Sequence, residues 1–188
     1  MIRIGILGST RGTNMLAIIS AIEQKRLRAS IDIVISNKPH AMILERATSH
    51  GLCAQFLNPE GLSREDYDQK ISSLLHLHQI DLVVLIGYMR ILSAPLVSTW
   101  QNKIINVHPS LLPAFSGKMD LEVHKAVLAS GVKESGCTVH YVTEEVDGGP
   151  ILLQKKCPVL ADDTPDTLKE RIQALESSAL LDAIATLI

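Results

Sequence analysis

Hydrophobic and polar positions along the first hundred residues form short blocks whose period switches between strand-like and helix-like. Apolar strands are expected at 3–7, 31–35, 54–57 and 82–86, and helices at 14–24, 41–50 and 64–78. Strands and helices alternate, and this order is typical of right-handed crossovers between parallel strands. The run at 82–86 contains no polar residue, which favours a strand buried on both faces.

The pattern changes after residue 100. A strand is expected at 104–108, followed by a proline-bounded loop at 109–117 and a short helix at 122–129. The turn Asp147-Gly148-Gly149-Pro150 separates two more strands, at 137–142 and 151–159, which favours antiparallel pairing between them. A last helix is expected to have Thr164 as its cap and Pro165 at its first position, and to run to the C-terminus.

These elements predict one α/β domain with a Rossmann-like fold, in which a mostly parallel, mixed sheet carries helices on both faces. The domain is expected to occupy residues 1–188, with one half over about 1–100 and the other over about 101–188. Only 3% of the residues are aromatic, so we expect an aliphatic core.

Composition and charge narrow the classes of function. The chain has 46% hydrophobic and 20% charged residues, which is typical of a folded globular protein. Its 18 basic and 20 acidic residues give a net charge of -2, which provides no electrostatic basis for binding nucleic acid or a membrane surface. The apolar runs are too short for a membrane span and the N-terminus lacks the pattern of a secretory signal, so a cytoplasmic location is expected.

The cysteines and histidines indicate no metal site. Cys53, Cys137 and Cys157 are odd in number and widely spaced, so we expect three reduced thiols rather than a disulfide framework or a zinc centre. Two neighbouring histidines, His76 and His78, diverge when they lie two positions apart on a helix.

A glycine-containing loop follows the first strand and leads into the first helix. Backbone N–H groups and the helix dipole favour an anion, commonly a phosphate, at such a place, and a side chain added at Gly12 is expected to enter the anion site. Thr13 stands where a P-loop requires lysine, and no acid follows the second strand as in a dinucleotide fingerprint. A plain strand-to-helix turn that needs glycine remains the alternative.

A second polar group lies at the end of the strand at 104–108. Asn106 and His108 are two positions apart and therefore point to the same face, where an amide and an imidazole could stabilise an oxyanion and move a proton. Asp147 lies on the tight glycine turn, and a carboxylate near His108 would raise the pKa of the imidazole above its free value. A structural histidine and an ordinary turn aspartate are the alternatives.

These motifs together resemble one family. The string IINVHPSLLP at 104–113, with Asp147-Gly148-Gly149-Pro150 downstream, resembles the folate-dependent formyltransferases. The Gly12-Thr13-Asn14 loop, the segment at 89–92 and Glu176 extend the resemblance over essentially the whole chain, to the members that formylate glycinamide ribonucleotide.

The resemblance implies a reaction. A formyl group would pass from the co-substrate 10-formyltetrahydrofolate to the amine of glycinamide ribonucleotide, a step of de novo purine biosynthesis, by direct attack of the amine and without a metal. Asn106, His108 and Asp147 would be catalytic, stabilising the tetrahedral intermediate and relaying protons.

The resemblance also implies binding residues. The first half of the chain would hold the phosphate of the ribonucleotide, and the second half would be the catalytic and folate-closing half. The ribonucleotide would be bound by Gly12, Thr13, Asn14 and Glu176. The folate would be bound by Arg64, Met89, Arg90, Ile91, Leu92, Asn106, Thr143, Glu144, Glu145, Val146 and Asp147, with the Arg64 guanidinium suited to the carboxylates of the glutamyl tail.

The chain departs from the family pattern at 118–124, which is longer than in many relatives, so no role is assigned to Lys118 or His124. Alternative functions are a formyl-folate hydrolase, a formyltransferase acting on methionyl-tRNA, and a non-catalytic nucleotide-binding module of the same fold. The first two usually carry a further domain for which 188 residues leave no room. The third has no need of the three catalytic residues.

Overall fold

The computed structural model describes residues 1–187, which form two compact units, Met1–Asn106 and Val107–Leu187. In the first unit, parallel strands run in the order β3-β2-β1-β4-β5. These strands are β1 (Ile2–Gly8), β2 (Ala29–Ser36), β3 (Ala54–Phe56), β4 (Leu82–Ile86) and β5 (Ile104–His108), the last of which continues into the second unit. The parallel arrangement is as the alternating pattern predicts, and β1 is the central strand of these five.

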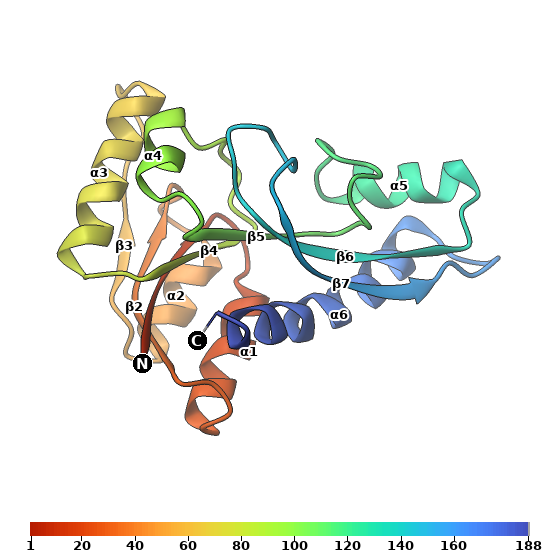
Figure 1. The fold of residues 1–188 in the computed structure, drawn as a ribbon, viewed down its shortest axis with the longest axis horizontal. Coiled ribbons are helices and arrows are strands. Elements are labelled where there is room, and N and C mark those ends of the chain that lie inside the picture. Colours follow the sequence, from red (N-terminus) through yellow and green to blue (C-terminus); the bar gives the residue numbers. More distant parts are fainter. Residues whose placement is uncertain (188) are drawn as a thin grey trace. The chain divides into compact units, whose positions relative to one another are not determined.

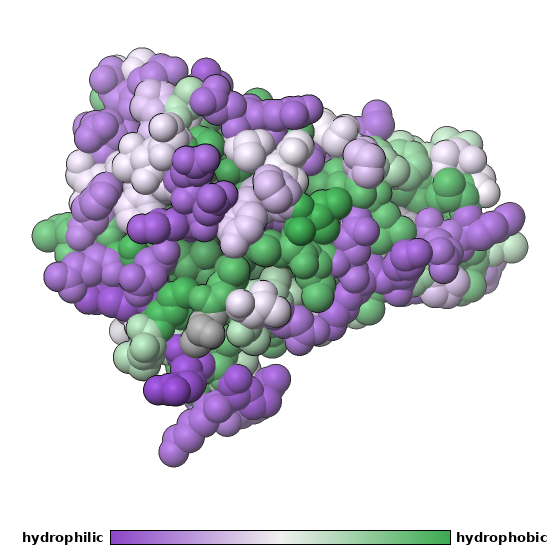
Figure 2. Space-filling view, viewed as in Figure 1, coloured by the Kyte–Doolittle hydropathy of each residue, from purple (hydrophilic) through white to green (hydrophobic). Residues whose placement is uncertain are grey.

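Helices cover both faces of this parallel sheet. Helices α1 (Thr13–Glu23) and α2 (Met42–Ser49) lie on one side, and α3 (Arg64–Leu77) and α4 (Ala94–Thr99) on the other (Figure 1). The outer surface of α3 is largely hydrophilic (Figure 2), because its apolar side chains point inward to the sheet. Ser63 caps α3 by accepting the N–H of Asp66 at 3.0 Å.

Three glycines near the start of the chain make room for these helices. A Cβ atom at Gly5 would lie 2.7 Å from the side chain of Leu75 on α3. A Cβ atom at Gly8 or at Gly12 would lie within 2.5 Å of the side chain of Ile43 on α2. The glycine pattern of the first loop therefore reflects helix packing in addition to any role in binding.

The second unit combines antiparallel strands with two helices. Strands β6 (Glu134–Tyr141) and β7 (Ile151–Pro158) pair in antiparallel fashion, which confirms the pairing predicted from the glycine turn. Helix α6 (Pro165–Ala185) packs on both strands and on α5 (Leu121–Ser130) (Figure 1). Thr164 caps α6 and Pro165 opens it, as predicted.

The core is mainly aliphatic, as the low aromatic content predicts, and Tyr67, Tyr88 and Trp100 are its large aromatic members. Among residues 1–187, no helix has the length and hydrophobicity that a membrane span requires.

Candidate active site

The end of β5 carries two polar side chains that are two positions apart. Asn106 and His108 point to the same face of the strand, and His108 is only 4% exposed. The loop after His108 is fixed by the hydroxyl of Thr138, which donates to Ser110 O at 2.7 Å and accepts from Leu112 N at 3.0 Å. Gln154 donates to the same hydroxyl at 2.9 Å, so the loop is tied to both β6 and β7.

His108 lies between two hydrogen-bond acceptors. Its Nδ1 is 3.3 Å from Oδ2 of Asp147, and its Nε2 is 3.3 Å from the carbonyl oxygen of Phe115. A neutral imidazole has one N–H and can donate to only one of these oxygens, whereas an imidazolium can donate to both. These two acceptors therefore favour the charged ring.

Burial opposes that charge. Removal of the imidazole from water lowers the pKa of His108 below its ordinary value, while Asp147 and the Phe115 carbonyl raise it less strongly. The expectation that Asp147 lifts the pKa above the free value is therefore wrong. The Asp147 carboxylate does raise the pKa of His108, as expected. Desolvation of His108, which is only 4% exposed, lowers that pKa by more.

Asp147 is held in a strained turn. Its backbone has a φ of 56°, in the left-handed region, and its Oδ2 accepts the N–H of Gly117 at 2.9 Å. A Cβ atom at Gly149 would lie 1.8 Å from the carbonyl oxygen of Tyr141, so only glycine fits at that position. The turn thus presents the carboxylate with one oxygen already committed to a backbone donor and to His108.

The sequence did not reveal a second histidine beside Asp147. His140 on β6 is 2% exposed, and its Nε2 lies 3.7 Å from Oδ1 of Asp147. Its Nδ1 lies 2.9 Å from the carbonyl oxygen of Tyr141, which assigns the proton of a neutral ring to Nδ1. No pattern in the sequence pointed to it, because β6 is buried almost throughout and its pairing with β7 shifts register between Val139 and His140.

The segment at 118–124 contributes a buried histidine, although no role was assigned to it. His124 on α5 is 2% exposed and its Nδ1 has no hydrogen-bond partner. Burial and the ammonium group of Lys169 lower its pKa, while Asp120 opposes them. Asp120 itself pairs with Lys169 at 2.5 Å, which ties the segment to α6.

We expect the free energy of unfolding to fall as the pH drops from about 6.5 toward 5. In that window the unfolded chain protonates its histidines near their ordinary pKa of about 6.5, whereas His108 and His124 have lowered pKa values in the folded state. The unfolded state then binds more protons, so acid favours unfolding. Each kcal/mol lost lowers Tm by about 2–4 °C in a domain of this size.

The measurement is urea unfolding between pH 5 and 8, for the unmodified chain and for His124→Gln. Because glutamine binds no proton, the variant should show a shallower decline below pH 6.5. Equal slopes for the two proteins would contradict the contribution of His124.

The first loop has the local structure that an anion site requires. Gly12 occupies the N-cap of α1 with a φ of 72°, and the first turn of α1 contains no acidic residue. Thr13 is exposed and Asn14 is 8% exposed. The expectation that a side chain at position 12 enters the anion site is wrong, because its Cβ atom would meet Ile43 instead.

The residues at 87–93 follow β4 in the same unit. Met89 and Ile91 are 41% and 59% exposed, whereas Leu92 is buried. The Arg90 guanidinium lies 4.5 Å from the centre of the Tyr67 ring, a cation–π contact with α3. Arg64, at the first position of α3, is half exposed and lies 3.7 Å from Glu65.

The remaining predicted residues lie in the second unit. The turn before Asp147 is polar and exposed at Glu144 and Glu145, and Val146 adds an exposed apolar side chain. The Thr143 hydroxyl donates to Glu145 O at 3.2 Å, which closes the turn. Glu176 on α6 is half-buried rather than solvated, and its charge adds to the burial that raises the pKa of Cys137 to about 12.

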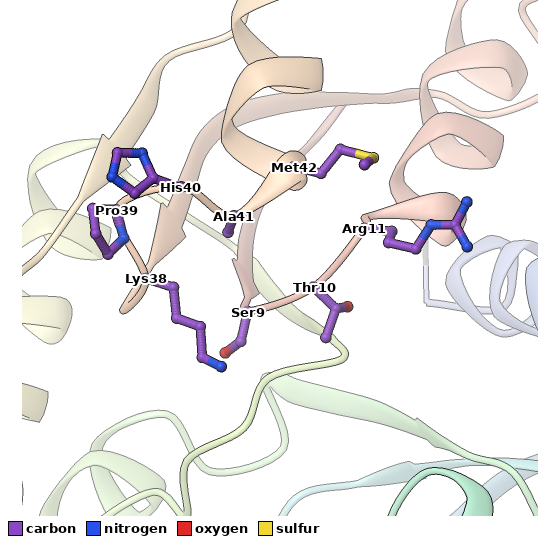
Figure 3. Close-up of a pocket in the computed structure, with 8 residues that line it drawn as sticks. All are labelled: Ser9, Thr10, Arg11, Lys38, Pro39, His40, Ala41 and Met42. Atoms are coloured by element: carbon purple, nitrogen blue, oxygen red, sulfur yellow. The ribbon is translucent and has the colours of Figure 1, made fainter.

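A pocket of about 390 Å³ next to the first loop was not predicted. Figure 3 shows its lining, which combines cationic, imidazole, hydroxyl and apolar groups and no carboxylate. The residues are Ser9, Thr10, Arg11, Lys38, Pro39, His40, Ala41 and Met42. Among residues 1–187, no group of three or more His, Cys, Asp or Glu side chains is arranged to hold a metal ion.

Comparison with known proteins adds to this geometry. The family model for "Formyl transferase" matches residues 2–184. Phosphoribosylglycinamide formyltransferase of Escherichia coli (strain K12) is 41% identical over 172 residues, which cover 91% of this chain and 80% of that protein. The trifunctional purine biosynthetic protein adenosine-3 of Drosophila melanogaster is 42% identical over 189 residues. This match covers 99% of the chain here but only 14% of the Drosophila protein's length.

Solved structures agree with the sequence comparison. The crystal structure of glycinamide ribonucleotide transformylase 1 from Symbiobacterium toebii has a TM-score of 0.93 and 44% sequence identity. The match covers 98% of this chain and 86% of that chain. The structure of phosphoribosylglycinamide formyltransferase from Bacillus halodurans has a TM-score of 0.92 at 36% identity, covering 98% of this chain and 94% of that one.

Proposed function

Because the chain belongs to the formyl transferase family, we propose that it transfers the formyl group of 10-formyltetrahydrofolate to the amine of glycinamide ribonucleotide. The observation that carries the proposal is the buried pair His108–Asp147, with Nδ1 and Oδ2 3.3 Å apart at the end of β5. This pair lies in a chain whose relatives are named for formyl transfer to this ribonucleotide. A nucleotide-binding module without turnover would have no need of a carboxylate held against a buried imidazole.

The chemistry follows from the groups at β5. The amine attacks the formyl carbon, negative charge grows on the formyl oxygen, and a proton moves from the amine to the departing folate nitrogen. Asn106 donates to the oxygen through its amide, and His108 takes up and returns the proton. Burial lowers the pKa of His108 and so favours the neutral ring, and Asp147 stabilises the imidazolium when it forms.

Binding roles are proposed for the residues that match the family pattern. Gly12, Thr13, Asn14 and Glu176 hold the ribonucleotide. The exposed side chains of Met89 and Ile91 offer apolar surface for the flat pteridine ring of the folate. We propose that the two units act as one domain in a cytoplasmic enzyme, with the turn at 143–147 contributing to the folate site.

The direct test is consumption of 10-formyltetrahydrofolate by the purified chain, with and without glycinamide ribonucleotide. A transferase consumes the folate only when the ribonucleotide is present. Equal consumption without the ribonucleotide would show a hydrolase, and no consumption in either case would favour the non-catalytic module.

We expect Arg64→Ala to weaken binding of a glutamylated folate about tenfold, a typical cost for losing a hydrogen bond to a charged group. A pteridine without the glutamyl tail should bind the variant and the unmodified chain equally, because it has no carboxylate for the guanidinium. Lys70→Ala removes another exposed cation from α3 and serves as the control. Equal losses for both ligands would contradict the assigned contact and make Arg64 a structural residue.

A further inference from the structure

The first loop and the segment after β4 are joined by one serine. The hydroxyl of Ser9 accepts the N–H of Met89 at 2.9 Å, and the N–H of Ser9 donates to the carbonyl oxygen of Gly87 at 3.2 Å. Figure 3 shows the side chains of Ser9 and Thr10 on the side of the loop that faces the segment after β4. Every one of these residues lies in the first unit.

The Ser9 hydroxyl is held in one orientation. Its single hydrogen is donated to Oδ1 of Asn37 at 2.6 Å, and the side chain is 5% exposed. Because the hydrogen points at Asn37, a lone pair of the same oxygen remains directed at the N–H of Met89. The serine is therefore a rigid link rather than a freely rotating surface hydroxyl.

Close packing beside this hydrogen bond limits independent movement of the two segments. Gly87 has a φ of 56°, and a Cβ atom at this position would lie 2.3 Å from Oγ1 of Thr10. A displacement of the loop at 9–10 must therefore move the backbone at 87–89 as well.

We propose that Ser9 couples binding of the ribonucleotide to binding of the folate. This inference rests on the proposed function, in which the ribonucleotide binds at 12–14 and the folate at 89–92. A phosphate bound to the first turn of α1 further restrains the motion of the loop that contains Ser9. The hydrogen bond from the N–H of Met89 to the Ser9 hydroxyl passes this restraint to the folate segment, which then loses less conformational entropy when the second ligand binds. The coupling is positive, and it is reciprocal.

The far end of the folate segment has a separate anchor. Asp68 on α3 accepts the N–H of Ser93 at 2.6 Å, and its carboxyl group is 1% exposed. This contact fixes the segment without touching the first loop. Loss of the Asp68 anchor should weaken folate binding and leave the coupling intact, which makes it the matched control.

The experiment measures the dissociation constant of folic acid, which has no formyl group to transfer, with and without saturating glycinamide ribonucleotide. In the unmodified chain the ribonucleotide should tighten folate binding about two- to tenfold, the range of one net hydrogen bond. Ser9→Ala should bring the ratio close to one. Asn37→Ala keeps the hydroxyl but frees its rotation, and should give an intermediate ratio. Asp68→Ala removes the oxygen that accepts the N–H of Ser93, and should bind folate more weakly at an unchanged ratio.

The outcomes separate the coupling from the function. A ratio of one in the unmodified chain, or an unchanged ratio in Ser9→Ala, overturns the coupling while both ligands still bind. Failure of the unmodified chain to bind either ligand overturns the proposed function and the coupling with it. If Ser9→Ala binds the ribonucleotide in the absence of folate, the variant is folded. Asn37→Ala tests the same link without removing the Ser9 hydroxyl.

Discussion

Replacing Asp147 with asparagine should lower kcat by about a hundredfold or more, with a smaller change in substrate binding. Asparagine keeps the size of the side chain and an oxygen for the N–H of Gly117, but it removes the negative charge 3.3 Å from the His108 ring. The negative charge of Asp147 raises the pKa of His108, whereas burial lowers it. Without it, the imidazolium that must form during proton transfer is less stable.

The pH profile separates this explanation from simple loss of folding. If activity requires the neutral ring, the acidic limb of kcat follows the pKa of His108, and in Asp147→Asn it should move to lower pH. Asp162→Asn, at an exposed position of the second unit, serves as the control. Full activity in Asp147→Asn with an unchanged profile would contradict the coupling of the two residues.

Replacing His108 with alanine should lower kcat at least as much as the change at Asp147, because it removes the group that carries the proton. The double variant should be little worse than either single variant, since residues that act as a unit are not additive. The measurement is a double-mutant cycle, with steady-state kinetics of the unmodified chain, the two single variants and the double variant.

The cycle is interpreted only for folded protein. His108 is buried, so its truncation leaves a cavity and costs stability, and each variant should first be shown to bind glycinamide ribonucleotide. Near-normal turnover in His108→Ala would contradict its catalytic role. Multiplicative losses in the double variant would show that the two residues act independently.

Most helices and strands could be predicted because each has a strong local pattern of hydrophobic positions or caps. The apolar run of β4 and the capped α6 agree with the structure almost to the residue. Helix α4 was missed, because Ala94–Thr99 has only six residues and too few turns to show a helical period. The strand β6 begins at Glu134, earlier than expected, because its first residues pair with β7 without a hydrophobic pattern.

The geometry of the site could be predicted only for residues that lie on the same strand or helix. Asn106 and His108 share a strand, so their common face follows from the sequence. The contact of Asp147 with His140 depends on the path of the turn back to β6, which spacing does not specify. The direction of the His108 pKa shift depends on its burial, and the role of Ser9 depends on a contact 80 residues along the chain.

The central claim is the transfer itself, and the fate of a labelled formyl carbon tests it most directly. The chain is incubated with 10-formyltetrahydrofolate, labelled with ¹³C in the formyl group, and with glycinamide ribonucleotide, and the products are followed by NMR. The label should appear as a formamide on the ribonucleotide, in step with loss of the folate substrate. Label that appears only as free formate would contradict transfer to the ribonucleotide.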